Sequence, residues 1–585
     1  MKKAQKAKRE FDKLKDQLFK IKEIVKSTKD NKLWSHEASV RKKIRALEDI
    51  RDKHINGFDA VYKGYLELLD EISIRLLNQY NKKNVTDYKF EEIISKDKRA
   101  YIRTGIISVL TTVHIPELVA LEFTKYFPSN PKDEYENTRR TKRKFVLHLG
   151  QTNTGKTYFA VERLKKAKNG AYLAPLRILA LENYEKLNKD GVPCHLITGE
   201  EEIIVKGAKH VCSTIEKLDI KEHYDVAVID EIQMIADMQR GDAWTRAVLG
   251  IDCDEIHVCG ALNAKDLIVE ILEDCGDYYE IIEYTRQIPL KVWDRPFSLN
   301  DAQKGDALVA FSKKRVLELS KLFMDKGIKN SVIYGDLPPE VRRMQYRAFL
   351  DGTNKILITT DAIGMGVNLP IRRIIFMSIK KFDGEDIRYL TTQEVKQIGG
   401  RAGRKGIYDV GYVGMAGYDQ LFLKHYLEIE DETLEKAVIG PGEAIVRIGG
   451  LPLKEKLALW STRVENDLYN KMDMRDYLYI LDNIKHFRLP QTAEYILMKL
   501  PFDVYDEIIM DCFLNYVYEY FKKPGGKISK PSRDGHLLSD LERYYQKLNL
   551  FYSFCKNFNI EFDPEWVYIQ RSKVSEEINK LLVNL

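Results

Sequence analysis

The 585-residue sequence has only seven cysteines, and none of them forms a C-x-x-C pair. This scarcity argues against a zinc ribbon or a disulfide framework and is typical of a reducing compartment. Long apolar runs are also lacking, because the nearest one, 106–121, is interrupted by His114, Pro116 and Glu117. A membrane-spanning helix needs roughly 18 or more apolar residues in succession. We therefore expect no membrane partner.

The N-terminal segment lacks the features of two common targeting signals. It has no apolar centre of the secretory type, and Glu10, Asp12 and Asp16 are atypical of a mitochondrial transit peptide. These two observations together predict a cytoplasmic protein.

Composition and charge indicate a soluble, multidomain chain. Hydrophobic residues make up 44% and charged residues 31% of the sequence, and roughly three to four domains are expected at this length. The net charge of +6 is unevenly distributed: residues 1–53 hold 18 Lys and Arg against 9 Asp and Glu, a net of +9 that leaves −3 elsewhere. A basic segment of this kind favours a polyanionic partner, with a solvated helix surface as the alternative.

Both ends of the chain show helical patterns. Three apolar stripes near the N-terminus repeat at three- and four-residue intervals, as on buried helix faces. They comprise Phe11, Leu14, Leu18, Ile21 and Val25; Val40, Ile44 and Leu47; and Val61, Tyr65, Leu68 and Ile72. We interpret 1–140 as a helical, basic accessory domain and 426–585 as a helical C-terminal domain. An aromatic helix after the basic loop 521–535 could stack bases, but a core stripe is the favoured interpretation.

The stretch 145–157, FVLHLGQTNTGKT, combines a buried strand with a G-x-x-x-x-G-K-T phosphate-binding loop and precedes an amphipathic helix. Glycines allow backbone N–H groups to surround phosphates, and the helix N-terminus adds positive potential. We expect Lys156 to reach the outer phosphates of ATP and the Thr157 hydroxyl to bind Mg²⁺. The predicted nucleotide-binding residues are Gly150, Gln151, Thr152, Asn153, Thr154, Gly155, Lys156 and Thr157.

From 141 to 290, apolar strands alternate with helices, as in a parallel α/β sheet. In such sheets, ligands lie beyond the carboxyl ends of the strands. The expected strands are 145–149, 171–173, 194–198, 210–212, 225–229 and 255–259. Because 225–229 ends in Asp230-Glu231, we expect Asp230 to hold Mg²⁺ together with Thr157, and Glu231 to orient and deprotonate the attacking water. General-base catalysis of this kind contributes about 10²–10⁴ in rate.

The alternation resumes from 291 to 425, with strands expected at 307–311, 331–334, 355–359 and 373–377. This second unit has no G-K-T of its own, so we expect it to act on the nucleotide of the first. Within QIGGRAGR, Arg401 and Arg404 are three residues apart, which on a helix is one turn. Arginines supplied by a neighbouring unit contribute roughly 10³–10⁵ to phosphoryl-transfer rates. Surface ion pairing is the alternative for the two arginines alone.

One further feature of this second unit is the Asp383-Gly384 pair between Phe382 and Ile387, which predicts a β-hairpin. It could act as a strand-separating wedge or form a plain surface hairpin.

The order of these motifs resembles that of superfamily 2 helicases: P-L-R, T-G-E-E, S-T, D-E-x-Q, C-G, T-D-A-I-G-M-G and Q-x-x-G-R-A-G-R follow the phosphate loop. Three stretches are similar to the corresponding sequences of the Suv-like RNA helicases of the mitochondrial RNA degradosome, which also have bacterial relatives: VIDEIQMI, IYGDLPP and TTDAIGMGVNLPIRRIIF. One departure is Ala261 after Cys259-Gly260, where the family usually has an acidic residue.

This resemblance implies two tandem RecA-like domains, at 141–290 and 291–425, with ATP between them and RNA across both. It implies that Gln397 positions water, that Arg401 and Arg404 act as arginine fingers, and that an exoribonuclease is a partner. The residues expected to face the RNA backbone are Pro175, Arg177, Thr198, Ser213 and Thr360.

The function implied is that of an ATP-dependent RNA helicase that moves along single-stranded RNA and separates duplexes. Two rival interpretations remain open: a DNA helicase or translocase on the same scaffold, and an ATP-gated RNA clamp that does not unwind.

Overall fold

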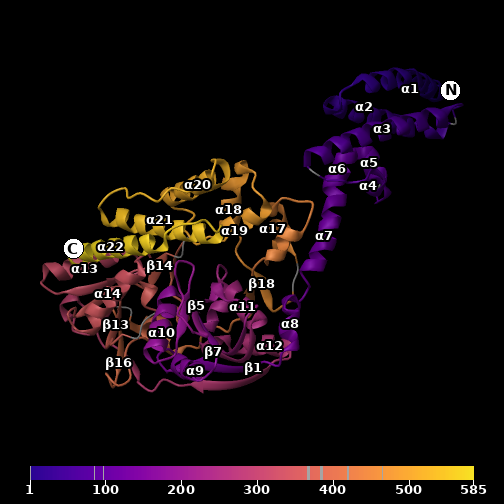
Figure 1. The fold of residues 1–585 in the computed structure, drawn as a ribbon. Helices are drawn as coiled ribbons and strands as arrows, with labels where there is room; N and C mark the ends of the chain where they lie inside the picture. Colours follow the sequence, from indigo (N-terminus) through magenta and orange to yellow (C-terminus); the bar gives the residue numbers. More distant parts are fainter. Residues whose placement is uncertain are drawn as a thin grey trace. The chain divides into compact units, whose positions relative to one another are not determined.

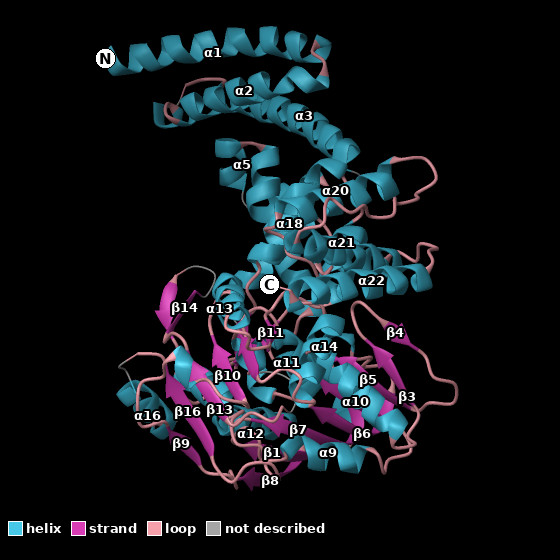
Figure 2. Cartoon of the chain, turned by 90° about the vertical axis from the view of Figure 1, so that its left-hand side faces the viewer, coloured by secondary structure: helices cyan, strands magenta, loops and turns pink. Residues whose placement is uncertain are grey.

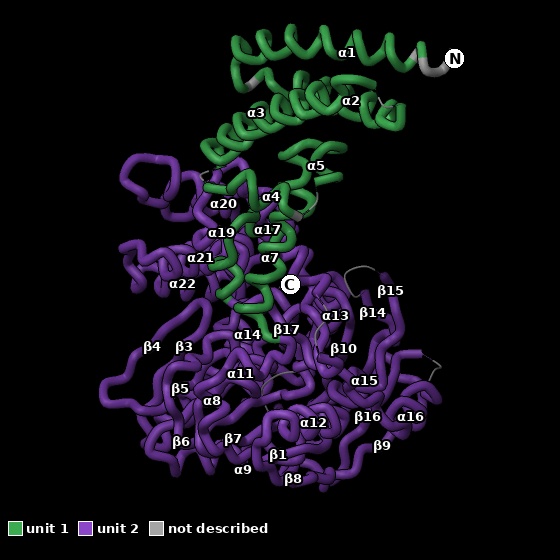
Figure 3. The backbone as a smooth tube through the Cα atoms, turned by 90° about the vertical axis from the view of Figure 1, so that its right-hand side faces the viewer, with its two compact units in different colours: residues 1–128, 443–456 green, residues 129–442, 457–585 purple. Residues whose placement is uncertain are grey.

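The computed structural model describes residues 2–53, 55–84, 86–96, 98–364, 369–382, 386–417, 420–463 and 466–584. The chain divides into two units, which Figure 3 distinguishes by colour. Unit 1 contains residues 1–128 and 443–456, and unit 2 contains residues 129–442 and 457–585. The four finer domains expected from the sequence, at 1–140, 141–290, 291–425 and 426–585, stay a prediction.

Unit 1 is helical, as the apolar stripes indicate. The stripe residues Phe11, Leu14 and Val25 are buried on the first helix, and those of the next two helices are buried throughout. Gly449, from the second segment of the unit, donates its backbone N–H to the Glu122 carboxylate at 2.6 Å. The helices are α1 (Lys2–Ser27), α2 (Leu33–Glu48), α3 (Phe58–Asn84), α4 (Phe90–Lys96), α5 (Lys98–Thr104), α6 (Ile106–Val109) and α7 (Ile115–Tyr126).

One helical stretch of unit 1, Ile106–Tyr126, has the length and composition of a membrane-spanning helix, the one such stretch among the residues that the structure describes. Its best window has a mean hydropathy of 1.6 and is 39% buried within the protein. Core helices of soluble proteins meet the same two criteria. Length and composition are therefore weak evidence for a membrane span here.

The first α/β domain, here called lobe 1, is built on an eight-stranded sheet in the order β4-β3-β5-β2-β6-β7-β1-β8. Figure 2 shows most of these strands in magenta, with α9 and α10 beside them. Every neighbouring pair is parallel except β3 and β4. The core on one face includes α11 and α12, and that on the other includes α9 and α10. The bounds are β1 (Lys144–Gly150), α9 (Lys156–Leu164), β2 (Gly170–Ala174), α10 (Arg177–Lys189), β3 (Cys194–Ile197), β4 (Glu202–Ile203), β5 (His210–Thr214), β6 (His223–Ile229), α11 (Gly241–Gly250), β7 (Asp252–Gly260), α12 (Lys265–Cys275) and β8 (Tyr278–Tyr284).

The second α/β domain, here called lobe 2, also belongs to unit 2. It has a six-stranded, all-parallel sheet in the order β11-β12-β10-β13-β16-β9. Two tandem parallel sheets with crossover helices confirm the RecA-like architecture. The bounds are β9 (Leu290–Val292), β10 (Asp306–Val309), α13 (Lys313–Asp325), β11 (Asn330–Ile333), α14 (Pro339–Leu350), β12 (Ile356–Thr359), β13 (Arg373–Phe376), α15 (Thr392–Gly399), β16 (Gly411–Met415) and α16 (Gln420–Glu428).

The expected hairpin is present in lobe 2. Strands β14 (Lys380–Phe382) and β15 (Ile387–Tyr389) pair antiparallel, and Phe382 and Ile387 are exposed. Residues 383–385, including the Asp383-Gly384 turn, lie outside the described residues. The wedge role stays a prediction.

The C-terminal region is helical, and its aromatic stripe is buried. Tyr545, Leu548 and Phe551 belong to the core, which agrees with the favoured interpretation of that stripe. Figure 1 shows the last three helices packed together at the end of the chain. The main elements are α18 (Arg475–Ile484), α19 (Gln491–Met498), α20 (Glu507–Lys522), α21 (Leu538–Asn557) and α22 (Pro564–Val583), with a small parallel pair, β17 (Ala437–Ile439) and β18 (Tyr469–Lys471).

A buried ion pair joins two neighbouring strands of lobe 2. The Arg373 guanidinium donates to both carboxylate oxygens of Asp306 at 2.7 and 2.6 Å, and both side chains are 1% exposed. We expect Arg373→Met to lower the free energy of unfolding by about 3–5 kcal/mol, because it leaves Asp306 charged and unpaired in the core. Urea denaturation measures the change. Arg295→Met, which removes an exposed pair with Asp301, is the control and should cost about 1 kcal/mol or less. An unchanged urea midpoint for Arg373→Met would contradict the expectation.

Candidate nucleotide-binding and catalytic site

A cleft of about 1510 Å³ is lined by residues from both lobes. Lobe 1 contributes the whole phosphate loop, 150–157, together with Asp230 and Glu231. Lobe 2 contributes Gln397 from α15 and Arg401 from the turn that follows this helix. The structure therefore brings together most of the residues that the sequence predicted for a nucleotide site.

The phosphate loop is held by its neighbours at both ends. A Cβ on Gly150 would lie 2.2 Å from the carbonyl oxygen of Tyr284 on β8, so only glycine fits where the loop begins. At the far end, the Lys156 ammonium donates to the carbonyls of Gly150 and Gln151 at 2.7 and 2.6 Å. Burial lowers the pKa of Lys156, although the nearby carboxylates oppose this. A desolvated ammonium at the mouth of such a loop is a favourable site for a phosphate.

Asp230 and Thr157 meet at the carboxyl end of β6. The Thr157 hydroxyl donates to Asp230 Oδ1 at 3.1 Å, and the buried Tyr172 hydroxyl donates to Asp230 Oδ2 at 2.8 Å. Burial, and then the charge of Glu231, raise the pKa of Asp230 to about 6. A hydroxyl and a carboxylate side by side are the hard oxygen donors that Mg²⁺ prefers, so these two residues fit that ion.

Glu231 is held in a strained backbone conformation. Its φ is +53°, in the left-handed region that few non-glycine residues adopt, and such strain is common at functional sites. The Gln233 side-chain amide donates to the Glu231 carboxylate, while its oxygen accepts from the Ala261 backbone N–H at 3.1 Å. A glutamine amide therefore connects the expected base to the end of β7, where the family's acidic residue is absent.

Arg401 reaches the cleft from lobe 2. Its Nη2 lies 4.0 Å from Glu231 Oε1, and its Nε donates to the Gly364 carbonyl at 3.1 Å. The helical turn expected to place Arg404 beside it does not form, because α15 ends at Gly399 and Gly403 has a φ of +76°. Arg404 is half-buried and is not among the described residues that line the cleft. Helical spacing thus does not put both arginines on one face.

The residues expected to face RNA follow the carboxyl ends of strands in both sheets. Thr198 and Ser213 are buried, and Thr360 is 8% exposed with its hydroxyl accepting from the Ala362 N–H. Pro175 is also buried, and its carbonyl accepts from Arg240 at 2.7 Å. Pro175, Thr198, Ser213 and Thr360 are therefore buried in this structure.

Arg177 is the centre of an internal ion-pair cluster. Its guanidinium lies 2.7 Å from Glu200, 3.0 Å from Glu201 and 3.3 Å from Glu340 of lobe 2. The Tyr545 hydroxyl on α21 accepts from Arg177 at 3.2 Å and donates to Glu340 at 2.7 Å. Sequence spacing gave no sign of this cluster, because its members come from four separate segments.

A chain of buried and part-buried hydrogen bonds supports the strand that enters the phosphate loop. His148 Nε2 lies 2.7 Å from His257 Nδ1, and His257 Nε2 lies 2.7 Å from the Glu255 carboxylate. Because a carboxylate only accepts, His257 must donate from Nε2 and accept at Nδ1 from His148. His148 Nδ1 then accepts from the Tyr284 hydroxyl at 2.8 Å. Burial, with a smaller effect of His257, lowers the pKa of His148 to about 4, which keeps the His148 ring neutral.

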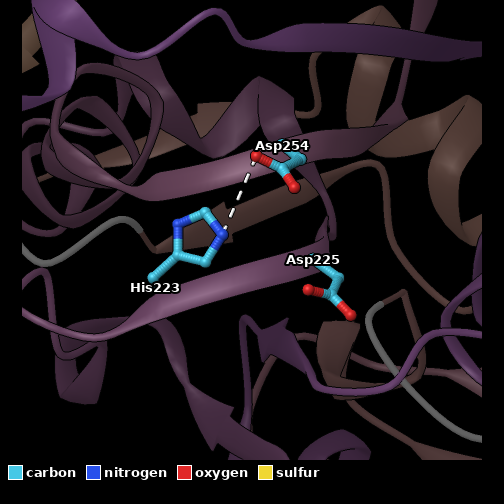
Figure 4. Close-up of side chains that lie close together, drawn as sticks. All are labelled: His223, Asp225 and Asp254. Atoms are coloured by element: carbon cyan, nitrogen blue, oxygen red, sulfur yellow. Dashed lines mark ion pairs between the residues drawn. The ribbon is translucent and has the colours of Figure 1, made fainter.

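A second polar cluster lies at the amino ends of β6 and β7. His223, Asp225 and Asp254 offer ligand atoms within 4.8 Å of one another (Figure 4), and His223 Nε2 is 3.7 Å from Asp254. Two of the three side chains are exposed, and surface clusters like this are common without a metal. The cluster lies at the amino ends of the strands, whereas the phosphate loop follows the carboxyl end of β1, so the cluster takes no part in the nucleotide site.

Glu182, on α10, also lines the cleft. Burial raises the pKa of Glu182 from 4.5 to about 7, despite the opposing charges of Arg343 and Arg401. The folded state therefore holds the proton more tightly than the unfolded state, and wild-type stability falls as the pH rises from about 4.5 through 7. We expect Glu182→Gln to be more stable than wild type by up to about 3 kcal/mol at pH 8, with little difference near pH 4.5.

Thermal unfolding of both proteins across this pH range checks the prediction. Glu222→Gln, at an exposed position of the same lobe, controls for the loss of one negative charge. A stability difference between Glu182→Gln and wild type that does not grow with pH would contradict it.

Three family models match the chain in sequence order. Residues 131–284 match the DEXQ-box helicase domain of Suv3, 291–406 match the helicase conserved C-terminal domain, and 538–584 match the ATP-dependent RNA helicase SUV3 C-terminal domain. The solved structure of Saccharomyces cerevisiae Dbp5 bound to RNA and ADP BeF3 aligns with 55% of this chain and 93% of its own, at 16% identity. Its TM-score of 0.39 is too low for a structural argument.

Curated relatives extend over more of the chain. The mitochondrial DExH-box ATP-dependent RNA helicase DExH16 of Arabidopsis thaliana is 40% identical over 65% of this chain and 68% of its own length. The mitochondrial ATP-dependent RNA helicase SUV3 of Oryza sativa subsp. japonica is 36% identical over 72% and 76%. The mitochondrial SUPV3L1 of Danio rerio is 38% identical over 67% of this chain, which spans about half of that relative, 54%.

These relatives correct one expectation and establish the family. The cytoplasmic location predicted from the N-terminal residues is wrong, because the relatives are named as mitochondrial proteins. The absence of a transit-like pattern in the first residues was therefore a poor guide. With two relatives above 30% identity matched over more than two thirds of their length, the chain belongs to the Suv3 family of ATP-dependent RNA helicases.

Proposed function

We propose that this protein is an ATP-dependent RNA helicase that couples ATP hydrolysis to movement along single-stranded RNA and to duplex unwinding. The observation that supports this best is the position of Arg401, which reaches from lobe 2 to within 4.0 Å of Glu231 in lobe 1. A nucleotide on the phosphate loop would then contact both lobes. Hydrolysis in such a cleft changes the relative stability of its closed and open arrangements, as a motor requires.

The roles of the site residues follow from their positions. Lys156 and the loop N–H groups of 150–157 would hold the triphosphate, and Mg²⁺, held by Thr157 and Asp230, would neutralise charge on it. Glu231, oriented by Gln233, would accept a proton from water positioned by Gln397. Arg401, with Arg404 as a second candidate, would stabilise the charge that develops on the transferred phosphoryl group.

RNA would be held through its phosphates, which allows movement over any sequence. The residues proposed to face the backbone remain Pro175, Arg177, Thr198, Ser213 and Thr360. Because Arg177 is paired with three glutamates, a phosphate must replace at least one of them to bind there. The basic segment 1–53 offers a further site for a polyanion.

The setting that we propose is mitochondrial RNA turnover, with single-stranded or partly duplex RNA as substrate and an exoribonuclease as partner. The support is the naming of the relatives and the family resemblance. A DNA helicase is the main alternative, and an ATP-gated RNA clamp is the second.

Two assays distinguish these functions. Stimulation of ATPase activity by single-stranded RNA but not DNA, with displacement of duplexes bearing 3′ or 5′ overhangs, supports an RNA helicase. Equal stimulation by DNA would favour the first alternative. ATP-dependent RNA binding without turnover would favour the clamp.

Replacing Lys156 tests the nucleotide site. We expect Lys156→Ala to lower the ATPase rate by about 10²–10³ or more, since it removes the ammonium that contacts the outer phosphates. Steady-state ATPase measurements with saturating RNA check this. Lys166→Ala, an exposed lysine just after α9, is the matched control and should behave as wild type. Turnover at the wild-type rate in Lys156→Ala would refute the site.

Replacing the arginines tests the contribution of lobe 2. We expect Arg401→Ala and Arg404→Ala to bind RNA as wild type does but to lose roughly 10³-fold in the rate of hydrolysis. RNA affinity by fluorescence anisotropy and single-turnover hydrolysis give the two readouts. Undiminished hydrolysis in either variant would remove that arginine from the finger role.

A further inference from the structure

Arg286 lies in the segment 285–289, the direct covalent link between the two sheets. It follows β8, an edge strand of lobe 1, and precedes β9, an edge strand of lobe 2. Its side chain is partly buried and lines the cleft that holds the phosphate loop. Burial lowers the pKa of Arg286, as expected for a cation removed from water.

The Arg286 guanidinium donates to backbone carbonyls. Its Nε donates to the carbonyl of Ile288 at 2.6 Å, Nη1 donates to that of Gly400 at 2.6 Å, and Nη2 donates to that of Ala402. Nη1 also lies 3.5 Å from the Thr152 carbonyl of the phosphate loop. No carboxylate pairs with Arg286 among the residues that the structure describes. Its charge is therefore balanced by carbonyl dipoles alone.

Two of these carbonyls flank Arg401. Gly400 and Ala402 lie just beyond α15, which ends at Gly399. A cation at a helix C-terminus is favourable, and the planar fork of arginine can bind two carbonyls at once. By fixing the peptide groups on both sides, Arg286 restricts the direction in which the Arg401 side chain leaves the backbone.

The phosphate loop also contacts the turn 400–403, which follows α15 and contains Arg401. A Cβ on Gly400 would lie 2.8 Å from the Thr152 Cβ, so glycine is needed for this approach. The Asn153 side-chain amide donates to the Gly403 carbonyl at 3.3 Å. A shift of the loop therefore acts on the backbone that carries Arg401.

We propose that Arg286 is a positioning residue that couples the conformation of the phosphate loop to the placement of Arg401 for hydrolysis. This role rests on the proposed ATPase function. Arg286 acts through Arg401 and the loop carbonyls, so its removal should affect the transition state more than the binding of ATP.

Kinetics of Arg286→Ala and Arg286→Lys in the full chain test the proposal. We expect kcat for RNA-stimulated ATP hydrolysis to fall about 10–100-fold in both, with KM for ATP changed less than about threefold, because small misplacement of a transition-state group costs about 10² in rate. Lysine keeps the charge but cannot hold two carbonyls, so it should not restore kcat. Arg295→Ala, an exposed arginine of the same lobe, is the matched control.

A double-mutant cycle shows whether Arg286 works through Arg401. We expect Arg286→Ala to lower kcat in the wild-type background but hardly at all in Arg401→Ala, since coupled residues are non-additive. Affinity for ADP with aluminium fluoride, a mimic of the transferring phosphoryl group, should fall while affinity for a non-hydrolysable ATP analogue is kept.

The outcomes separate this proposal from the proposed function. Wild-type kcat in Arg286→Ala, additive effects in the cycle, or full rescue by lysine would each overturn the positioning role. If Arg286→Ala loses stability, binding stoichiometry for the ATP analogue normalises kcat to folded protein, and a normalised kcat equal to wild type would show a structural role only. Absence of RNA-stimulated hydrolysis in wild type and Arg295→Ala would instead defeat the proposed function itself.

Discussion

The close contact between the phosphate loop and the glycine-rich turn after α15 is the constraint on which the site depends. Thr152 and Gly400 approach so closely that no side chain fits at the second position. The same turn places Arg401 near Glu231, so one backbone segment both contacts the loop and presents a cation to the cleft. The distance between Thr152 and Gly400 therefore affects where the Arg401 guanidinium lies relative to a triphosphate bound on the phosphate loop.

The C-terminal helices contact both lobes outside the cleft. Tyr545 on α21 joins Arg177 of lobe 1 to Glu340 of lobe 2, and Gln345 of α14 donates to Asn579 of α22 at 2.8 Å. The Ser553 hydroxyl adds a bond to the Gly199 carbonyl at 2.9 Å. These polar contacts involve both lobes, and such contacts can exchange when the lobes move.

Much of this arrangement could be predicted from the sequence, and the exceptions have physical reasons. The ten expected strands are found within a few residues of their predicted bounds, because central parallel strands are continuous apolar runs. Edge strands such as β8 and β9 were missed, since their half-exposed residues leave no such run. The phosphate loop and Asp230-Glu231 could be identified because binding phosphate and Mg²⁺ requires particular residue types at these positions. Arg286 was missed because binding carbonyls through space requires no motif.

If RNA binds at Arg177 as proposed, the cluster around this residue relates that binding to the state of the lobes. One guanidinium there is paired with three carboxylates, two from lobe 1 and one, Glu340, from lobe 2. A phosphate that binds Arg177 must displace a carboxylate, and Glu340 is the partner whose release separates the lobes at this point. Phosphate binding at Arg177 would then be coupled to closure of the nucleotide cleft between the lobes. Thermodynamic linkage requires that each of these two events changes the free energy of the other by the same amount. The proposed movement along RNA requires this reciprocity, and Arg177 with its three glutamate partners is placed to supply it.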